Sequence, residues 1–317
     1  MFVTFLHNAI RFSTVFLFGS TGETLTEKSG HLNMGIPGTM CFGALGGIIG
    51  ESIYLGTLRS VAFINPTLAV LIPMLTAMLF AAIMGLLYSF LTVTLRCNQN
   101  VTGLTITTFG VGLTNYFGSS INKIGFSIAS TAFTKPVFAP ATNWFSNIFL
   151  SYGVLVYLAM FIAIVVLVVL KKTRIGLNLR AVGENPGTAD AAGINVTAYK
   201  YTATIIGSAI AGLGGLFYIM DYLTGSWEYT IDAMGWLAVA LVIFSMWNPG
   251  WGILGAIVFG GLYIAPYYLN VNFAQQELVK MIPYLVTIIV LIIISIVGKK
   301  ETQPPASLGV SYFREER

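Results

Sequence analysis

Residues 149–170, FLSYGVLVYLAMFIAIVVLVVL, form a run of 22 residues without a charged side chain. A second run, residues 281–297 with the sequence MIPYLVTIIVLIIISIV, is also free of charge. A helix that crosses a lipid bilayer needs about 20 predominantly apolar residues. Both runs therefore predict membrane-spanning helices.

The composition of the whole chain points the same way. Of its 317 residues, 56% are hydrophobic and 9% are charged, whereas soluble domains carry about 25% charged residues. The chain lacks the charged side chains that a water-facing surface requires. We therefore expect an all-α fold, a polytopic transmembrane helical bundle of about 8–10 spans with broken or re-entrant helices.

Apolar windows place the expected spans along the chain. They cover approximately residues 3–19, 39–55, 67–95, 101–116, 149–170, 199–222, 233–247, 252–267 and 280–297. A polar, glycine-rich link, residues 20–38, follows the first span. Polar residues 118–147 indicate a loop outside the membrane. The third span is long enough that it must tilt or extend beyond the bilayer.

The distribution of charge predicts the orientation. Residues 171–180 hold four basic side chains and no acid, so the loop 171–200 should face the cytoplasm. Lys299 and Lys300 flank the last span and are expected on the same side. The loop 118–147 then lies outside. This positive-inside pattern also explains the net charge of +4, so we do not expect a nucleic acid as partner.

Two domains follow from these patterns. Residues 1–300 should form the transmembrane domain, with a cytoplasmic loop at about 171–200. Residues 301–317 contain Pro304 and Pro305 with mixed charge, and they are expected to form a flexible cytoplasmic tail.

The loop 171–200 carries the signals of a short helix. Asn185 suits the N-cap position, Pro186 suits the first helical position, and Gly193 can end the helix in a left-handed conformation. One interpretation is a capped helix that only shortens the link between two spans. The other is a docking element for a soluble partner, in which Glu184 and Asp190 offer polar contacts.

The sequence of this loop resembles that of a known protein family. Residues 180–186, RAVGENP, and residues 191–195, AAGIN, are similar to the cytoplasmic coupling loop of permease subunits of bacterial ABC importers. The branch is the one that handles ribose, other simple sugars, branched-chain amino acids and nucleosides. The resemblance implies that the loop contacts a separate ATPase subunit. The implied contact residues are Arg180, Gly183, Glu184, Asn185, Pro186, Asp190, Gly193 and Asn195.

Two further stretches carry the same resemblance. Residues 22–30, GETLTEKSG, and 32–38, LNMGIPG, look like the motif near the first span of nucleoside and simple-sugar permeases. The sequence departs from that motif at Pro37, where many relatives have a glutamate. Residues 234–249, MGWLAVALVIFSMWNP, resemble the family's penultimate re-entrant region. The chain length favours the shorter permease of nucleoside systems, with a permease for simple sugars as the alternative.

Polar and helix-breaking residues mark a candidate path for the solute. Irregular backbone at membrane depth is tolerated only where it is buried in protein or lines a cavity. The candidates near two such breaks are Asn33, Gly35, Pro37, Gly38, Asn98, Asn100, Thr102 and Thr108. The alternative is that these side chains satisfy backbone groups or neighbouring helices.

The sequence contains no phosphate-binding G-x-x-x-x-G-K-[ST] motif. We therefore expect no cofactor on this chain and no enzymatic activity of its own, with ATP and Mg²⁺ held by a partner ATPase. The resemblance implies three protein partners: a cytoplasmic ABC ATPase, a second homologous permease and an extracytoplasmic substrate-binding lipoprotein. It also implies a bacterial cytoplasmic membrane. A secondary carrier that works alone is the rival, which scarce intramembrane carboxylates disfavour.

Overall fold

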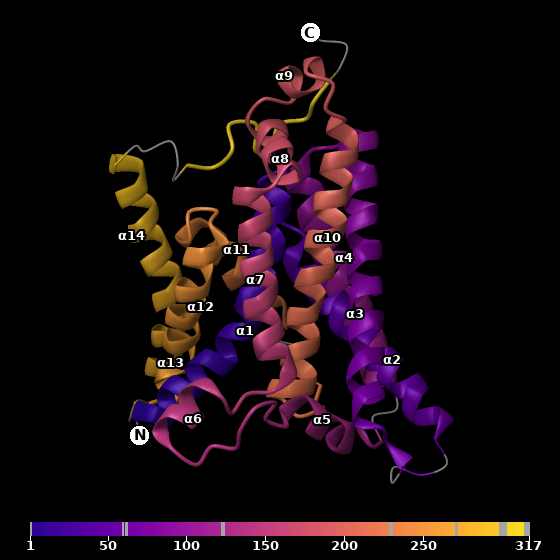
Figure 1. Cartoon of the computed structure of the whole chain (residues 1–317), viewed down its shortest axis with the longest axis vertical. Coiled ribbons are helices and arrows are strands. Elements are labelled where there is room, and N and C mark those ends of the chain that lie inside the picture. Colours follow the sequence, from indigo (N-terminus) through magenta and orange to yellow (C-terminus); the bar gives the residue numbers. More distant parts are fainter. Residues whose placement is uncertain are drawn as a thin grey trace.

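A computed structural model describes residues 2–58, 60, 63–121, 124–227, 231–269, 272–297 and 303–313. Helices and turns, and no strand, make up these residues, so the predicted all-α class is confirmed. The longer helices run side by side along the long axis of the molecule (Figure 1). They are α1 (Phe2–Glu27), α2 (Ile36–Thr57), α3 (Pro66–Ser89), α4 (Gln99–Ser120), α7 (Val154–Lys172), α10 (Val196–Phe217), α11 (Ile231–Phe244), α12 (Pro249–Ile264) and α14 (Ile282–Val297).

Short elements lie mainly at the two ends of the bundle. They are η2 (Phe90–Thr94), α5 (Phe126–Thr134), α6 (Trp144–Phe149), α8 (Arg174–Glu184), α9 (Pro186–Ala191), η3 (Tyr218–Tyr222), η4 (Ala265–Tyr267) and α13 (Phe273–Lys280). Among the described residues, six helical stretches are long and apolar enough to cross a membrane, and α11 and α14 contain shorter apolar stretches. The chain is therefore a multi-pass membrane protein.

The two ends of the bundle differ in character. Helices α8 and α9 lie with the C-terminal segment at one end, while α5, α6 and the N-terminus lie at the other (Figure 1). Lys171 and Lys172 end α7 on the side of α8. By the positive-inside rule this end faces the cytoplasm. Lys299 and Lys300, expected on the same side, lie outside the described residues.

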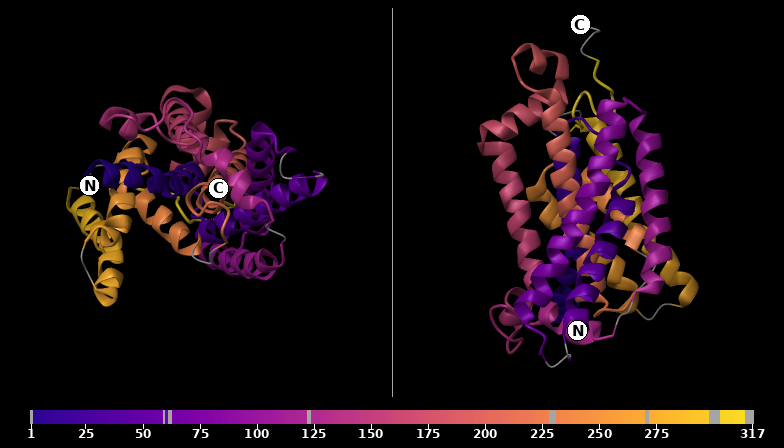
Figure 2. Two further views of the ribbon diagram at one scale, coloured as in Figure 1. Left: turned by 90° about the horizontal axis from the view of Figure 1, so that it is seen from below. Right: turned by 90° about the vertical axis from the view of Figure 1, so that its right-hand side faces the viewer.

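Glycines allow the central helices to approach closely. A methyl group at Gly43 of α2 would lie 2.4 Å from the Cα of Gly212 in α10. A methyl group at Gly22 of α1 would lie 2.2 Å from the carbonyl oxygen of Gly207, also in α10. The core of the bundle is therefore α10 packed against α1, α2 and α3 (Figure 2). These glycines thus mark places where the helix backbones contact each other directly.

The first span is longer than expected. We predicted its end near Gly19 and a polar link from Ser20, but α1 continues to Glu27. Residues 20–27 are all buried within the protein, where polar helix residues need no lipid contact. Thr26, for example, donates its hydroxyl to the carbonyl of Gly22 at 3.2 Å. The predicted end at Gly19 is therefore wrong, because polar residues continue the helix inside the protein.

The uncharged run 149–170 is also not one helix. It begins in the last residue of α6, and α7 starts only at Val154, with Gly153 at its N-cap. A methyl group at Gly153 would lie 1.9 Å from the carbonyl oxygen of Phe133. The chain therefore turns at this glycine because it passes directly against α5.

Candidate functional site

The cytoplasmic loop folds as its capping residues predict. Asn185 closes α8 and accepts a hydrogen bond from the Thr188 backbone amide at 2.9 Å, while Pro186 begins α9. Gly193 adopts a left-handed conformation with φ 83°. Asn195 then caps α10 by accepting from the Ala198 amide at 3.0 Å. Two short helices thus stand at the cytoplasmic end between the spans α7 and α10.

The predicted coupling residues divide between two faces of this loop. Five are exposed: Arg180, Glu184, Asn185, Gly193 and Asn195. Pro186 and Asp190 are half-buried, and Gly183 is buried. A methyl group at Gly183 would lie 2.4 Å from the carbonyl oxygen of Lys28. Gly183 therefore fits the loop against the end of α1, and the exposed residues are the ones available to a partner.

The C-terminal segment 303–313 lies on the same loop. Ser307 donates both its amide, at 3.1 Å, and its hydroxyl, at 2.5 Å, to the carbonyl of Gly183. Gly309 donates its amide to the carbonyl of Gly30 at 3.2 Å. Tyr312 donates its hydroxyl to Asp190 at 2.8 Å. These hydrogen bonds join the segment to parts of the chain that are distant in sequence, and a flexible tail over residues 301–317 stays a prediction.

The end of α1 joins the other two sequence motifs. The indole N–H of Trp247, in the turn after α11, donates to the carboxyl of Glu27. Glu23, one helical turn earlier, accepts from the backbone amide of Asn33 at 3.0 Å. Met246 and Trp247 both have φ 54°, which non-glycine residues rarely adopt. The polar groups of α1 thus hold the α1–α2 break and the α11 turn in place.

Glu23 and Glu27 lie in the motif 22–30, but the sequence did not predict them as site residues. Their spacing of four residues, which puts them on one face of a helix, was the available signal. Lys28 continues this cluster toward the loop. Burial lowers the pKa of Lys28, and the nearby carboxylate of Glu184 acts in the opposite direction. Lys28 therefore links the end of α1 electrostatically to the loop 171–200.

The residues predicted at the first break are buried. The side-chain oxygen of Asn33 accepts a hydrogen bond from the Gly35 amide at 2.9 Å. Its side-chain nitrogen has no hydrogen-bond partner among the described residues. A methyl group at Gly38 would lie 2.5 Å from the carbonyl oxygen of Ile106 in α4. Pro37 lies directly against Gly235 of α11. Gly35, Pro37 and Gly38 therefore bring α2, α4 and α11 together.

The residues predicted at the second break have different positions. Asn98 is the N-cap of α4 and accepts from the amides of Asn100 and Val101 at 3.0 and 3.1 Å. Thr102 is buried, and its hydroxyl donates to the Asn98 carbonyl at 2.8 Å. Asn100 and Thr108 are exposed. Asn98 and Thr102 therefore shape the start of α4, whereas Asn100 and Thr108 lie on its surface.

Helix α4 carries a polar stripe on its exposed face. The helix packs mainly against α2 and lies at an edge of the bundle (Figure 2). Its exposed residues at intervals of three or four form this stripe: Thr105, Thr108, Gly112, Asn115 and Ser119. Uncharged polar side chains of this kind hydrogen-bond to neighbouring helices in membrane proteins. The exposed stripe therefore fits contact with protein or water.

A cavity of about 580 Å³ opens at the cytoplasmic end, beside the coupling loop. Arg180 and Glu184 of α8 line it together with Lys28 and Trp247. The same cavity thus contains predicted coupling residues and residues of the α1–α11 contact.

Comparison with known proteins gives the family. Residues 5–291 match the family described as the branched-chain amino acid transport system permease component. The chain belongs to this permease family. The permease is a transport subunit, and its place is the cytoplasmic membrane, as the sequence predicts.

Three relatives show how far the likeness extends. The permease is 30% identical to the nucleoside ABC transporter permease NupC of Lactococcus lactis, over 98% of this chain and 96% of the relative. It is 28% identical to the guanosine ABC transporter permease NupQ of Bacillus subtilis, over 93% and 92%. It is 31% identical to a putative glucose ABC transporter permease, TsgC13 of Haloferax volcanii, over 80% and 74%.

A second ABC permease from each of the first two bacteria also matches, at 24% identity. No solved structure matches the permease.

Proposed function

We propose that this permease forms the translocation path for nucleosides in an ATP-driven importer. The observation that carries the proposal is the likeness to NupC, which extends over almost the full length of both chains. A permease for simple sugars is the second candidate, because TsgC13 is equally similar in identity. The same proposal includes a substrate-binding lipoprotein on the outer side, which would deliver the solute.

The coupling loop is the proposed docking site of a separate ATPase. The side chains of Arg180, Glu184 and Asn185 are exposed, and Arg180 and Glu184 line the cavity beside Lys28 and Trp247. The inner side of the loop contacts Lys28 through Gly183, and Lys28 directly follows Glu27, the partner of Trp247. A displacement of the loop by the ATPase would therefore reach the α1–α2 break and the α11 turn. ATP and Mg²⁺ would bind on the ATPase.

Substitutions in the loop test this role. In the assembled transporter we expect Glu184→Ala and Pro186→Ala to uncouple ATP hydrolysis from nucleoside uptake while the protein still inserts. Ser127→Ala, an exposed change on α5 at the opposite end, should leave both activities unchanged. Wild-type uptake and ATPase stimulation in both loop variants would contradict the docking role.

A second homologous permease is the proposed neighbour of α4. Two observations support it: the polar stripe on α4 is exposed in the single chain, and two permeases from one organism both match this sequence. The solute path would then run between the two permeases, along Thr105, Thr108 and Asn115.

The identity of the solute has its own test. Titration calorimetry on the binding lipoprotein that copurifies with the transporter should show binding of nucleosides and not of ribose, galactose or glucose. Binding of a pentose or hexose alone would replace the nucleoside proposal with the sugar proposal.

A further inference from the structure

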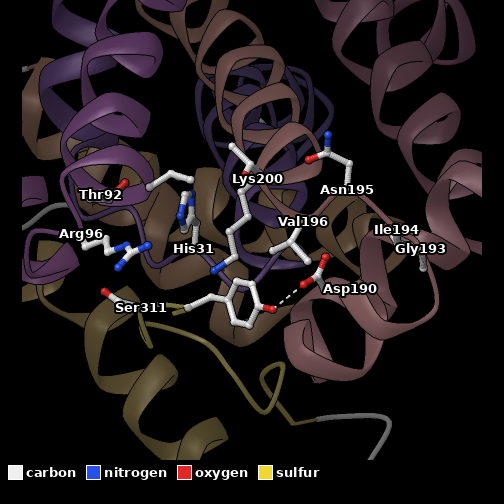
Figure 3. Close-up of a pocket in the computed structure, with 13 residues that line it drawn as sticks. His31, Thr92, Arg96, Asp190, Gly193, Ile194, Asn195, Val196, Lys200 and Ser311 are labelled. Carbon is white, nitrogen blue, oxygen red and sulfur yellow. Dashed lines mark hydrogen bonds between the residues drawn. The ribbon is translucent and has the colours of Figure 1, made fainter. Parts of the chain in front are cut away.

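A second cavity, of about 430 Å³, opens at the cytoplasmic end (Figure 3). Four separate segments surround it: the α1–α2 link with His31, η2 with the turn that follows it, residues 190–200, and the C-terminal segment. Its size falls within the range of small-molecule sites in proteins. The cavity is therefore large enough for an organic ligand and is formed entirely within one chain.

Two basic side chains and one histidine, each from a different segment, line this cavity. Lys200 is only 2% exposed, and it makes no hydrogen bond or ion pair with any described residue. The guanidinium of Arg96 stacks on the ring of Phe313 at 4.8 Å and forms no ion pair within the described part of the chain. Figure 3 shows the side chains of Lys200, Arg96 and His31 around the same space.

His31 adds a neutral donor. Its Nδ1 lies 3.1 Å from the hydroxyl of Thr204. When Nδ1 accepts that hydroxyl, Nε2 carries the proton and can donate. Burial lowers the pKa of His31 well below its usual value, and the charge of Lys200 acts in the same direction. Both effects favour the uncharged imidazole.

Two of the remaining features suit the same kind of ligand, and the carboxylate of Asp190 in the same lining opposes it. The start of α10 lines the cavity with Val196 and Thr197, and a helix N-terminus favours negative charge. Ser311 adds a hydroxyl group. The acid in the lining, Asp190, is bound by the hydroxyl of Tyr312 at 2.8 Å. No described carboxylate pairs with Lys200.

An isolated buried ammonium group is costly, because it has lost its hydration without gaining a counter-charge. Arginine binds phosphate oxygens in a bidentate manner, and lysine binds phosphate as a point charge. We propose that this cavity binds a phosphate-bearing ligand from the cytoplasmic side, held by Lys200, Arg96 and His31. Soluble phosphates and phospholipid headgroups share this chemistry.

The site would also connect to the coupling loop. Ser311 and Tyr312 form one wall of the cavity, and Ser307 of the same segment is bonded to Gly183 of α8. A ligand that bridges Lys200 and Ser311 would therefore hold the C-terminal segment on the loop. This ligand is distinct from the transported solute, whose proposed path is the face of α4.

Binding to the purified full-length permease tests the proposal. Calorimetry in detergent free of anionic lipid would use inorganic phosphate and AMP as probes. Nanodiscs of phosphatidylglycerol and of phosphatidylcholine, compared by thermal unfolding, would probe the headgroup. We expect Lys200→Gln and Arg96→Gln each to weaken binding by at least about tenfold, as loss of a charged hydrogen bond does. Lys172→Gln, an exposed change at the same end, should have no effect.

Each outcome has a defined meaning. Binding of phosphate or AMP supports the site with a soluble ligand. A stabilisation by phosphatidylglycerol that the two cavity variants lose, without phosphate or AMP binding, supports it with a lipid headgroup. Absence of all three effects would overturn the proposal, as would binding that Lys200→Gln and Arg96→Gln leave unchanged. Arg96 is exposed, so its variant stays informative if Lys200→Gln fails a size-exclusion check.

Discussion

At the scale of single residues, the contact between Glu27 and Trp247 joins two helices that are far apart in sequence. The indole N–H of Trp247 is buried and donates to the Glu27 carboxyl. A buried donor left without an acceptor costs about 1–3 kcal/mol. We expect Glu27→Leu to lower the stability of the purified permease by this amount, whereas Glu27→Gln keeps an acceptor and most of the stability.

Thermal unfolding in detergent, followed by tryptophan fluorescence, measures this difference. Equal melting temperatures for the two variants would show that the hydrogen bond to Trp247 contributes little, and would remove the argument that Glu27 holds the α11 turn.

Close packing at Gly22 leads to a second residue-scale prediction. A methyl group there would meet the carbonyl oxygen of Gly207, a backbone atom that cannot rotate away. Overpacking of this kind costs about 1–3 kcal/mol, so Gly22→Ala should lower the melting temperature. Gly56→Ala is the matched control, because nothing lies within 4 Å of that position. An equal effect of both substitutions would indicate that helix propensity, and not the α1–α10 contact, governs the change.

At the scale of elements, local chemistry predicts the cytoplasmic loop well and the first helix poorly. Asn185, Pro186 and Gly193 act through their own backbone and nearest neighbours, so their roles in the caps can be read from sequence. The helix α1 extends to Glu27 because α10 and α11 cover its polar end. That cover depends on contacts between distant segments, which residue spacing does not reveal.

In the candidate site, too, local contacts can be predicted from the sequence and contacts between distant segments cannot. Asn98 and Thr102 were predicted as polar groups of a solute path, and the structure shows them making the local bonds of the α4 start. Threonine and asparagine side chains often satisfy nearby backbone groups in this way, and the place of Asn98 and Thr102 in a solute path stays a prediction. Lys200, by contrast, was not predicted as a site residue, because its cavity forms only when four separate segments meet.

The C-terminal segment supports a prediction of its own. A chain that ends at residue 302 loses the bonds from Ser307 to Gly183 and from Tyr312 to Asp190. We expect faster hydrogen exchange in peptides covering residues 180–196 of the truncated protein, with unchanged exchange in α6 at the opposite end. Identical exchange in the loop would mean that the segment does not stabilise it.

At the scale of the whole molecule, the two faces of α4 decide where the proposed solute path lies. One face packs on α2, while the other carries the polar stripe. In a Cys97→Ser background, Thr108→Cys in the assembled transporter should react with a water-soluble thiol reagent, and nucleoside should slow the reaction. Leu79→Cys, on the exposed apolar side of α3, should not react. A Thr108→Cys variant that is inert, or as unreactive as Leu79→Cys, would place the stripe away from water.

Reconstitution in liposomes tests the central claim that this chain is the nucleoside permease of an ATP-driven importer. The permease would be combined with its ATPase, the second permease and the binding lipoprotein, and uptake of labelled nucleoside would be followed with and without ATP. The account predicts uptake that requires both ATP and the ATPase. Nucleoside uptake by the permease alone, without any ATPase, would contradict it.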